Sequence, residues 1–182
     1  MRLKFGLVLF FLLPSLLQAQ ASAAAEYRAK AHFLSKFPFF VEWPEHVLPT
    51  AAPFLICVYG DFSFGTSLAE KTRDTAIHER SVEIRWVRKE QELKSCQILF
   101  VSRSEQRRYS HVLEAVRTHG VLTVGETAEF LDAGGIVSLT MLQEGLQFDV
   151  NLDGANKVRL RISAQMLALA RRVVYKAEGA KI

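Results

Sequence analysis

The sequence predicts a single α/β domain with a mixed central sheet of about five to six strands flanked by helices, ending in a hairpin and a helix. Three observations predict this fold. Short apolar runs that are typical of strands alternate with segments of helical periodicity. Two late apolar runs are separated only by Gln143-Glu144-Gly145, as in a hairpin. The 182 residues are enough for one sizeable core, and the chain contains no internal repeat and no linker.

The first half of the chain supplies two helices and two strands. Residues 24–37 are rich in helix formers, and Pro38 ends or kinks that helix. Residues 53–59 form a continuous apolar run that predicts a buried strand, and residues 65–73 favour a short helix. Residues 81–88 alternate between apolar and polar, which indicates a strand with one covered face.

The middle of the chain continues the alternation. Residues 97–102 and 121–124 predict two short strands. Between them, residues 105–119 favour a helix that Gly120 stops. A helical turn is expected at residues 127–131.

The C-terminal part predicts a hairpin followed by a helix. The two hairpin strands are expected at residues 136–142 and 146–152. Residues 163–175 favour a helix whose inward positions are Leu167, Ala170 and Val174.

The first two dozen residues have the order of a secretory signal peptide. Arg2 and Lys4 form a positive region, residues 5–17 are almost uniformly apolar or small, and small residues follow at the spacing of a cleavage site. The apolar run is shorter than the about 20 residues that a membrane span needs. We therefore expect residues 1–23 to be cleaved and residues 24–182 to form an exported domain. An uncleaved signal anchor is the alternative.

Positive charge gives no support for nucleic-acid binding. The formal net charge is +4, and the loss of Arg2 and Lys4 with the signal peptide lowers it by two, to +2. The chain has no block of five like charges, and the clusters at residues 103–108 and 171–172 are typical of solvated helix faces. We expect no nucleic-acid partner.

The two cysteines, Cys57 and Cys96, lie beside apolar segments that predict strands. In an oxidising compartment an even pair most simply forms one disulfide. The bridge would close a loop of about 40 residues and stabilise the fold by roughly 3–4 kcal/mol. Two buried free thiols are the alternative. No Cys-x-x-Cys motif is present and no histidine stands at ligand spacing, so we expect no metal or redox centre.

The sequence contains no catalytic or cofactor motif. The five histidines include no pair at metal-binding spacing, and the carboxylates form no evident acid–base pair. The dinucleotide pattern G-x-G-x-x-G and the hydrolase pattern G-x-S-x-G are both absent. We therefore expect neither an enzyme nor a cofactor.

Two places have features of a small-anion site. The turn from Gly60 and Asp61 to Gly65 follows a strand and opens a helix, where backbone N–H groups can hold an anion; a purely structural turn is the alternative. Arg159 and Arg161 alternate with apolar residues, so an extended segment would place both arginines on one face. A half-buried strand with a solvated basic face is the alternative there.

Several sequence blocks, in a fixed order and spacing, resemble one family. They include residues 37–44, 57–61, 98–102, 121–125, 134–136, 148–152, 160–163 and 167–171. With these blocks the chain resembles the YfiR-like family of periplasmic regulatory proteins along almost its whole mature length.

The resemblance implies a non-catalytic periplasmic α/β regulator that acts in cyclic-di-GMP signalling and biofilm control. The best-known member holds an inner-membrane diguanylate cyclase inactive through the periplasmic part of the cyclase. An outer-membrane lipoprotein relieves that inhibition by sequestering the regulator. Cys57 and Cys96 match a disulfide pair of that member, whereas a second pair is absent here, where Leu131 and Ser138 lie nearby.

We therefore expect the mature protein to bind and restrain the periplasmic region of a membrane signalling protein, in particular a diguanylate cyclase. An outer-membrane lipoprotein and a second copy of the chain are further candidate partners. The apolar residues expected to contact the partner are Leu152, Val158, Leu160, Ile162 and Leu167. The alternative function is a periplasmic anion-binding protein that serves a transport or sensor system.

Residues 37–44 carry more large apolar side chains than a loop usually does. We expect them to pack under the N-terminal helix as core. A contact surface for a partner or a second copy is the alternative.

Overall fold

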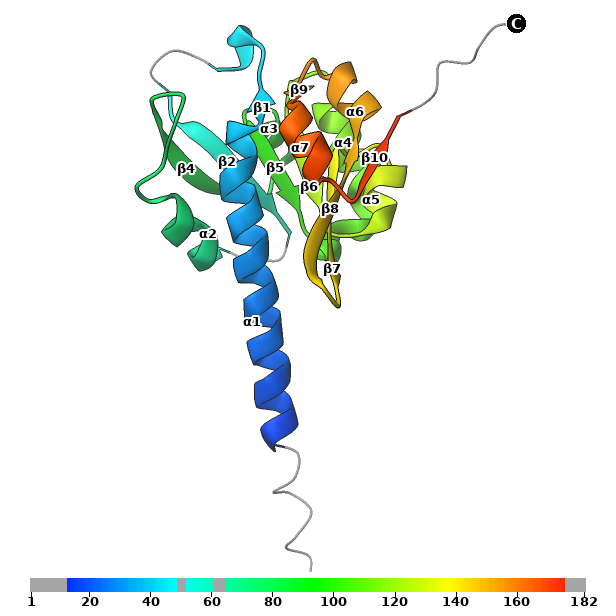
Figure 1. Ribbon diagram of the computed structural model, residues 1–182. Coiled ribbons are helices and arrows are strands. Elements are labelled where there is room, and N and C mark those ends of the chain that lie inside the picture. The colour runs from blue at the N-terminus through cyan, green and yellow to red at the C-terminus, as the bar shows by residue number, and fades with distance from the viewer. Residues whose placement is uncertain (1–12, 49–51, 61–64, 176–182) are drawn as a thin grey trace, which may run out of the picture.

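The computed structural model describes the backbone of residues 13–48, 52–60 and 65–175 (Figure 1). Side chains are described for residues 23–48, 52–60 and 67–175. The strands are β1 (Val41–Glu42), β2 (Phe54–Tyr59), β3 (Ala76–Ile77), β4 (Arg80–Val87), β5 (Ile98–Val101), β6 (Leu122–Gly125), β7 (Val137–Leu142), β8 (Gly145–Asn151), β9 (Arg161–Ile162) and β10 (Arg172–Val174).

The α-helices alternate with these strands, as an α/β domain requires. They are α1 (Leu13–Lys36), α2 (Gly65–Thr72), α3 (Glu90–Leu93), α4 (Tyr109–Val116), α5 (Ala128–Asp132), α6 (Leu152–Lys157) and α7 (Ala164–Leu169). Three 3-10 helices are also present: η1 (Phe37–Phe39), η2 (Glu45–Val47) and η3 (Arg103–Arg108). The helix expected at residues 105–119 therefore begins as the 3-10 helix η3 and becomes regular only in α4.

The predicted fold class is confirmed, with a larger sheet than expected. The main sheet has eight strands in the order β10-β8-β7-β6-β5-β2-β4-β3, and β1 and β9 form a second, two-stranded sheet. β2, β4, β5, β6 and β7 run parallel, whereas the hairpin partners β7 and β8 are antiparallel, which makes the sheet mixed. The additional strands β1, β3, β9 and β10 span two or three residues each, too few for a periodic pattern to reveal.

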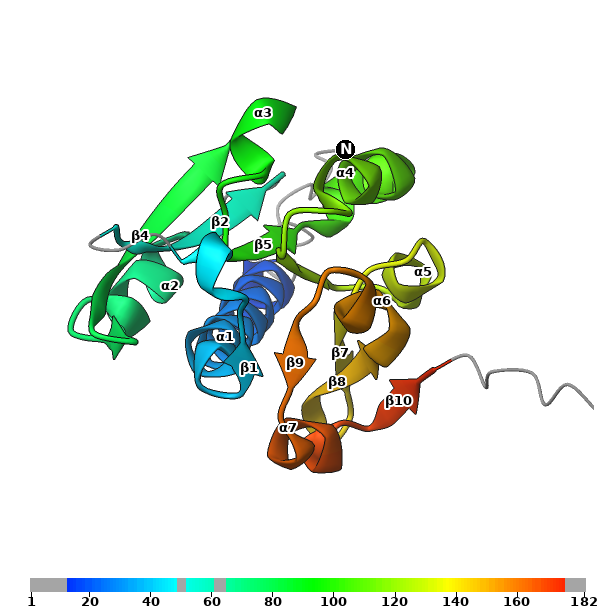
Figure 2. The same ribbon diagram turned by 90° about the horizontal axis from the view of Figure 1, so that it is seen from above.

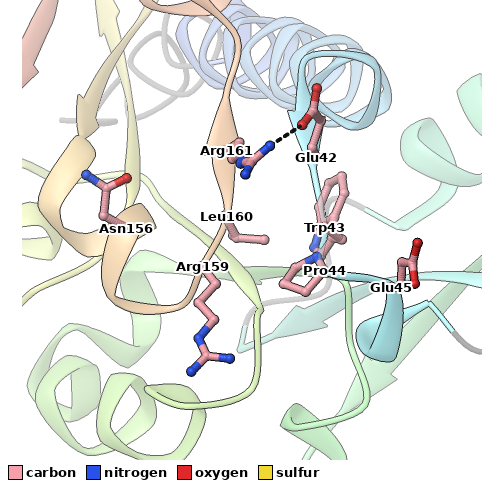
Figure 3. Close-up of a pocket in the computed structure, with 8 residues that line it drawn as sticks. All are labelled: Glu42, Trp43, Pro44, Glu45, Asn156, Arg159, Leu160 and Arg161. Carbon is pink, nitrogen blue, oxygen red and sulfur yellow. Dashed lines mark ion pairs between the residues drawn. The ribbon is translucent and has the colours of Figure 1, made fainter.

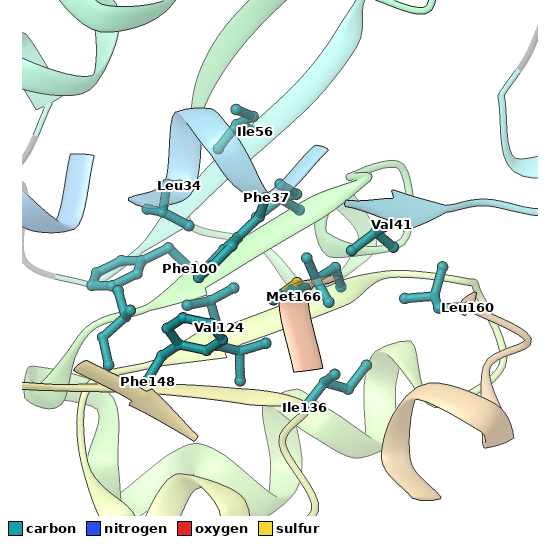
Figure 4. Close-up of a cluster of buried hydrophobic side chains, with 14 of the residues drawn as sticks. Leu34, Phe37, Val41, Ile56, Phe100, Val124, Ile136, Phe148, Leu160 and Met166 are labelled. Carbon is teal, nitrogen blue, oxygen red and sulfur yellow. The ribbon is translucent and has the colours of Figure 1, made fainter. Parts of the chain in front are cut away.

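The sheet is covered on both faces, and β2 shows why. All six of its side chains are buried, and alternate residues point to opposite faces. Phe54, Ile56 and Val58 join a cluster with residues of α1, α2 and α7, part of which appears in Figure 4. The alternate residues of β2, which include Cys57, join a second cluster with α3, α4 and α5. Figure 2 shows these two sets of helices on opposite sides of the sheet.

The predicted disulfide between Cys57 and Cys96 is confirmed. The two Cα atoms are 5.9 Å apart, and both residues are buried in the second cluster. The bridge joins β2 to the segment that enters β5, its neighbour in the sheet.

The large apolar side chains of residues 37–44 lie in the core or pack against it, as expected, with one exception. Phe37, Val41 and Trp43 are buried, and the Trp43 ring packs edge-on against Phe54 with ring centroids 5.1 Å apart. Phe39 is the exception, with an exposed fraction of 54%. Residues far away in the sequence hold this segment in place, because β1 forms an antiparallel pair with β9.

The prediction of one helix over residues 163–175 is wrong for the second half of that range. The helix α7 ends at Leu169, and Arg172–Val174 forms the edge strand β10, parallel to β8. The physical reason lies in β8: the N–H of Arg171 donates to the carbonyl of Phe148, and its guanidinium binds the buried Asp149. These bonds pull the chain into an extended conformation, and Val174 is exposed rather than inward.

The helix α1 runs without a break from Leu13 to Lys36, through the residues where cleavage is expected. Residues 1–12 of the expected signal peptide lie outside the described residues, and the structure does not test the cleavage. Among the described residues, none of the helices combines the length and apolar character that a membrane span requires.

Candidate functional site

The turn at Gly60, for which the sequence left an anion site and a structural turn open, is only partly described. Gly60 ends β2 with a φ of 101°, in the left-handed region that favours glycine. A Cβ there would lie 2.7 Å from Ser104 Oγ, so a larger residue would clash. Gly65 begins α2, and Asp61 lies outside the described residues. The glycine therefore serves close packing, and anion binding at this turn stays a prediction.

Arg159 and Arg161, the other candidate ligand residues, lie about 100 residues from Gly60 in sequence and line a different place. They border an open cleft of about 640 Å³ between the β1 segment and the α6–β9 connection (Figure 3). The residues lining this cleft are Glu42, Trp43, Pro44, Glu45, Asn156, Arg159, Leu160 and Arg161.

The two arginines do not act together. Arg161 points toward Glu42, with 3.9 Å between its guanidinium and the carboxylate, whereas Arg159 points to the other end of the cleft (Figure 3). Arg159 also has a positive φ of 60°, so the chain is not extended there as expected. Both members of the Arg161–Glu42 pair are highly exposed, so the pair stabilises the fold little.

The cleft combines balanced charge with an apolar wall. Glu42 and Glu45 oppose the two arginines, so the charged lining residues sum to zero at neutral pH. Trp43, Pro44 and Leu160 supply apolar surface between them, and the buried Trp43 Nε1 has no hydrogen-bond partner among the described residues. This arrangement is suited to a ligand with both donors and acceptors rather than to a simple anion.

A group of buried charges forms at the carboxyl ends of the parallel strands. Lys30 of α1 is only 2% exposed and pairs with Glu126, which follows β6, and with Glu26, one turn back on α1. The backbone N–H of Arg103 donates to the second oxygen of Glu126, over 2.6 Å. Ligands of open α/β sheets commonly bind at this edge. Here Lys30 and Glu126 line an open cleft of about 360 Å³, and their ion pair fixes α1 to the sheet.

The apolar residues expected to contact a partner lie largely beneath the surface. Leu160 is 1% exposed and belongs to the core, so its side chain is not part of a contact surface in this structure. Val158, Ile162 and Leu167 are partly buried against the same core cluster, and Leu152 is half-buried at the start of α6. Partner binding at these residues stays a prediction.

A groove between α1 and α7 exposes apolar surface that sequence reasoning missed. We call it the α1–α7 groove; it measures about 470 Å³ and is lined by Phe33, Leu146, Gln147, Phe148, Leu169 and Arg171. Leu169 is 68% exposed, more than the other large apolar residues described. Its exposure follows from the end of α7 at this residue, which the sequence did not reveal because residues 163–175 favoured one long helix.

Catalytic groups are not gathered in any of these places. The described residues contain no group of histidine, cysteine, aspartate and glutamate side chains that could hold a metal ion. Burial raises the pKa of Tyr59 and Tyr109, and the hydrogen bond to Asp149 raises the pKa of Arg171. Each of these side chains lies in the core or in an ion pair, where a shifted pKa has a structural cause.

Comparisons with solved structures give only weak likenesses. One is the "Crystal structure of conserved domain protein" from Vibrio cholerae O1 biovar El Tor, with 14% identity and a TM-score of 0.49, covering 71% of this chain and 57% of that chain. Another is the ABC domain in complex with L-Trp from "Streptococcus pneumonia", with 12% identity and a TM-score of 0.47, covering 66% of this chain and 55% of that chain. The chain thus spans little more than half the length of either, and both TM-scores are too low to inform on function. No curated protein matches the chain significantly.

The family comparison is more informative. A family model described as YfiR/HmsC-like matches residues 27–171, which include all of the main sheet except its edge strand β10. Members of this family are periplasmic. Because the match covers most of the chain, the protein belongs to the YfiR/HmsC-like family.

Proposed function

We propose that the protein is a non-catalytic periplasmic regulator that binds and restrains the periplasmic part of an inner-membrane diguanylate cyclase. The observation that carries the proposal is the family match over residues 27–171. Through the cyclase, the protein would lower cyclic-di-GMP and so limit biofilm formation. An outer-membrane lipoprotein that sequesters the regulator would relieve the restraint.

Export fits the structure of α1. We propose that residues 1–23 are removed as a signal peptide. The side chains of α1 that are buried among the described residues begin at Lys30 and continue through Ala31, Leu34 and Ser35, all of which the mature chain keeps. The buried disulfide also suits an oxidising compartment. Intact-mass measurement of the protein purified from the periplasm should give a chain that begins at Ala24.

Deletion of the gene tests the regulator. We expect cellular cyclic-di-GMP to rise several-fold in the deletion strain, and a plasmid copy of the wild-type gene to restore it. A copy lacking residues 1–23 keeps the folded domain in the cytoplasm and should not restore it. Unchanged cyclic-di-GMP in the deletion strain, with its inner-membrane cyclases expressed, would remove the regulator proposal.

A second candidate is the periplasmic protein expected from the sequence, which would bind a small anionic ligand for a transport or sensor system. Arg159 and Arg161 line one cleft, where Glu42 and Glu45 balance their charge. Inorganic phosphate is a suitable first probe in calorimetric titrations of the mature protein. Saturable binding that Arg159→Ala and Arg161→Ala abolish, together with unchanged cyclic-di-GMP in the deletion strain, would replace the regulator by this binder. The exposed Lys94→Ala variant, which removes a cation that does not line the cleft, is the matched control.

A further inference from the structure

We propose that the α1–α7 groove docks an amphipathic helix of a partner protein whose polar side is acidic. This inference rests on the proposed function, because the helix would belong to the periplasmic part of the restrained signalling protein. The groove is distinct from the apolar residues expected from the sequence to contact that partner.

The floor of the groove is apolar and continuous with the core. The Phe33 ring lies edge-on to the ring of Phe148, with centroids 5.7 Å apart, and Leu146 lies beside them in β8. Met141 stands directly opposite Leu146 in the β7–β8 hairpin, so both side chains share one face of the sheet. Met141 is 41% exposed and extends the apolar surface toward the hairpin end.

One wall of the groove offers a protruding anchor. Leu169 ends α7 beside the hairpin and α1, an arrangement visible in Figure 1 and Figure 2. A large, exposed aliphatic side chain at the edge of an apolar groove gains most when a partner covers it. The apolar side of an amphipathic helix would cover Leu169 and Leu146 together.

The rim of the groove carries excess positive charge. Lys36 is exposed, lies one helical turn beyond Phe33 on α1, and has no acidic partner among the described residues. On the opposite side, Arg171 and Arg172 both bind the single carboxylate of Asp149. Two guanidinium groups on one carboxylate leave one positive charge uncompensated. An occupant with acidic residues on its polar side complements this rim.

The shape of the groove favours a helix as its occupant. β8, which forms its floor, is paired with β7 along its length, whereas β10 pairs only with residues 149–151. A helix that inserts its apolar side chains among Phe33, Leu146 and Leu169 is the mode of peptide recognition that uses this hollow, and strand addition beside residues 145–147 is the competing mode. The groove is concave, so a helix fits into it better than a flat membrane surface would.

The first experiment measures binding of a defined probe. The probe is a fluorescent synthetic helix with leucine on one side and glutamate on the other, titrated with the mature protein and followed by anisotropy. We expect saturable binding, weakened at least tenfold by Leu169→Gln and by Lys36→Glu. The controls Trp86→Gln and Lys94→Glu change an exposed apolar residue and an exposed lysine elsewhere, and should leave the affinity unchanged.

Three further probes separate the alternatives. A scrambled peptide of the same composition lacks the apolar side, and a peptide with lysine in place of glutamate has the wrong charge; neither should bind. Vesicles of phosphatidylethanolamine and phosphatidylglycerol represent a membrane surface. Failure of the acidic helix to bind, equal binding of the scrambled peptide, or vesicle binding lost in both groove variants would overturn the proposal.

Cyclic-di-GMP measurements keep this proposal separate from the proposed function. If deletion of the gene raises cyclic-di-GMP, we expect Leu169→Gln and Lys36→Glu to raise it as well, at normal protein levels. A rise in the deletion strain but in neither variant would remove the docking site and leave the regulator standing. Unchanged cyclic-di-GMP in the deletion strain would remove the regulator, whatever the peptide binds.

Discussion

The side chains of Lys30 and Glu126 show how single residues hold this fold together. Both are almost fully buried, and each charge is compensated: Lys30 by Glu126 and Glu26, and Glu126 by Lys30 and the N–H of Arg103. A buried ion pair stabilises a fold little against an apolar replacement, but loss of one partner leaves an uncompensated charge. The pair therefore fixes where α1 lies on the sheet.

Removing one member of this pair should be costly. We expect Lys30→Met to lower the free energy of unfolding by about 3–5 kcal/mol, because the buried Glu126 then loses its cationic partner. Urea denaturation followed by circular dichroism measures the change. The control is Arg117→Met, which breaks the exposed Arg117–Glu114 pair and should cost about 1 kcal/mol at most. Equal effects of the two variants would contradict this account.

The buried Tyr109 predicts a loss of stability at high pH. Its pKa is raised, mainly because burial penalises the ionised phenol. In the unfolded chain the phenol ionises near pH 10, before it does in the folded protein, so stability is complete below about pH 10 and falls as the pH rises toward the folded pKa. We expect Tyr109→Phe to reduce this fall in denaturation curves measured across that range. The same change at the exposed Tyr175 is the control and should leave the pH dependence as in the wild type.

At the scale of elements, the segment from η1 to η2 links the two ends of the chain. Its strand β1 pairs with β9, and the N–H of Ser163 donates to the carbonyl of Phe40. Its large apolar side chains lie in the core or pack against it, except that of Phe39, which is exposed. Packing in the core therefore explains most of the apolar residues at positions 37–44. It does not explain Phe39, whose side chain is exposed.

Truncation of two aromatic residues in this segment should change the stability of the protein by very different amounts. Trp43→Ala removes a ring that packs on Phe54, and we expect it to lower the free energy of unfolding by about 3–5 kcal/mol. Phe39→Ala removes a mostly exposed ring and should change it by about 0.5 kcal/mol. Thermal and urea denaturation of both variants gives the comparison. A stable Trp43→Ala protein would mean that the ring contributes to an interface rather than to the core.

At the scale of the whole molecule, two apolar clusters share one sheet. The disulfide lies in the cluster covered by α3, α4 and α5, and it closes a loop across a sequence separation of 39 residues. That loop contains α2, β3, β4 and α3, and the bridge closes it at the neighbouring central strands β2 and β5. Its main effect is expected on the unfolded chain, whose conformations it restricts.

Loss of the bridge should therefore destabilise the whole domain. We expect the double variant Cys57→Ala, Cys96→Ala to be less stable by roughly 3–4 kcal/mol, with a Tm lower by about 10 °C. Calorimetry measures both, and the reduced wild-type protein should behave like the variant. Two free thiols in the unreduced, denatured wild-type protein would contradict the bridge itself.

The sequence by itself determined the elements with strong local patterns. The runs at residues 53–59 and 97–102 read as buried strands because every position in a strand covered on both faces is apolar. The hairpin followed from two apolar runs around a short polar turn, and the disulfide from two cysteines in a chain that reads as exported. Family membership was visible in the order of its sequence blocks.

Only the tertiary structure decided where the surface lies. Leu160 and Leu169 are the same residue type in similar surroundings in sequence, yet one is buried and the other is the most exposed large apolar side chain described. Arg159 and Arg161 are two positions apart, yet they point to opposite ends of a cleft. Asp149, far along β8, ends the helical periodicity at α7 by binding Arg171. Local patterns record preferences of neighbours in sequence, whereas exposure and pairing depend on segments that meet only in the folded chain.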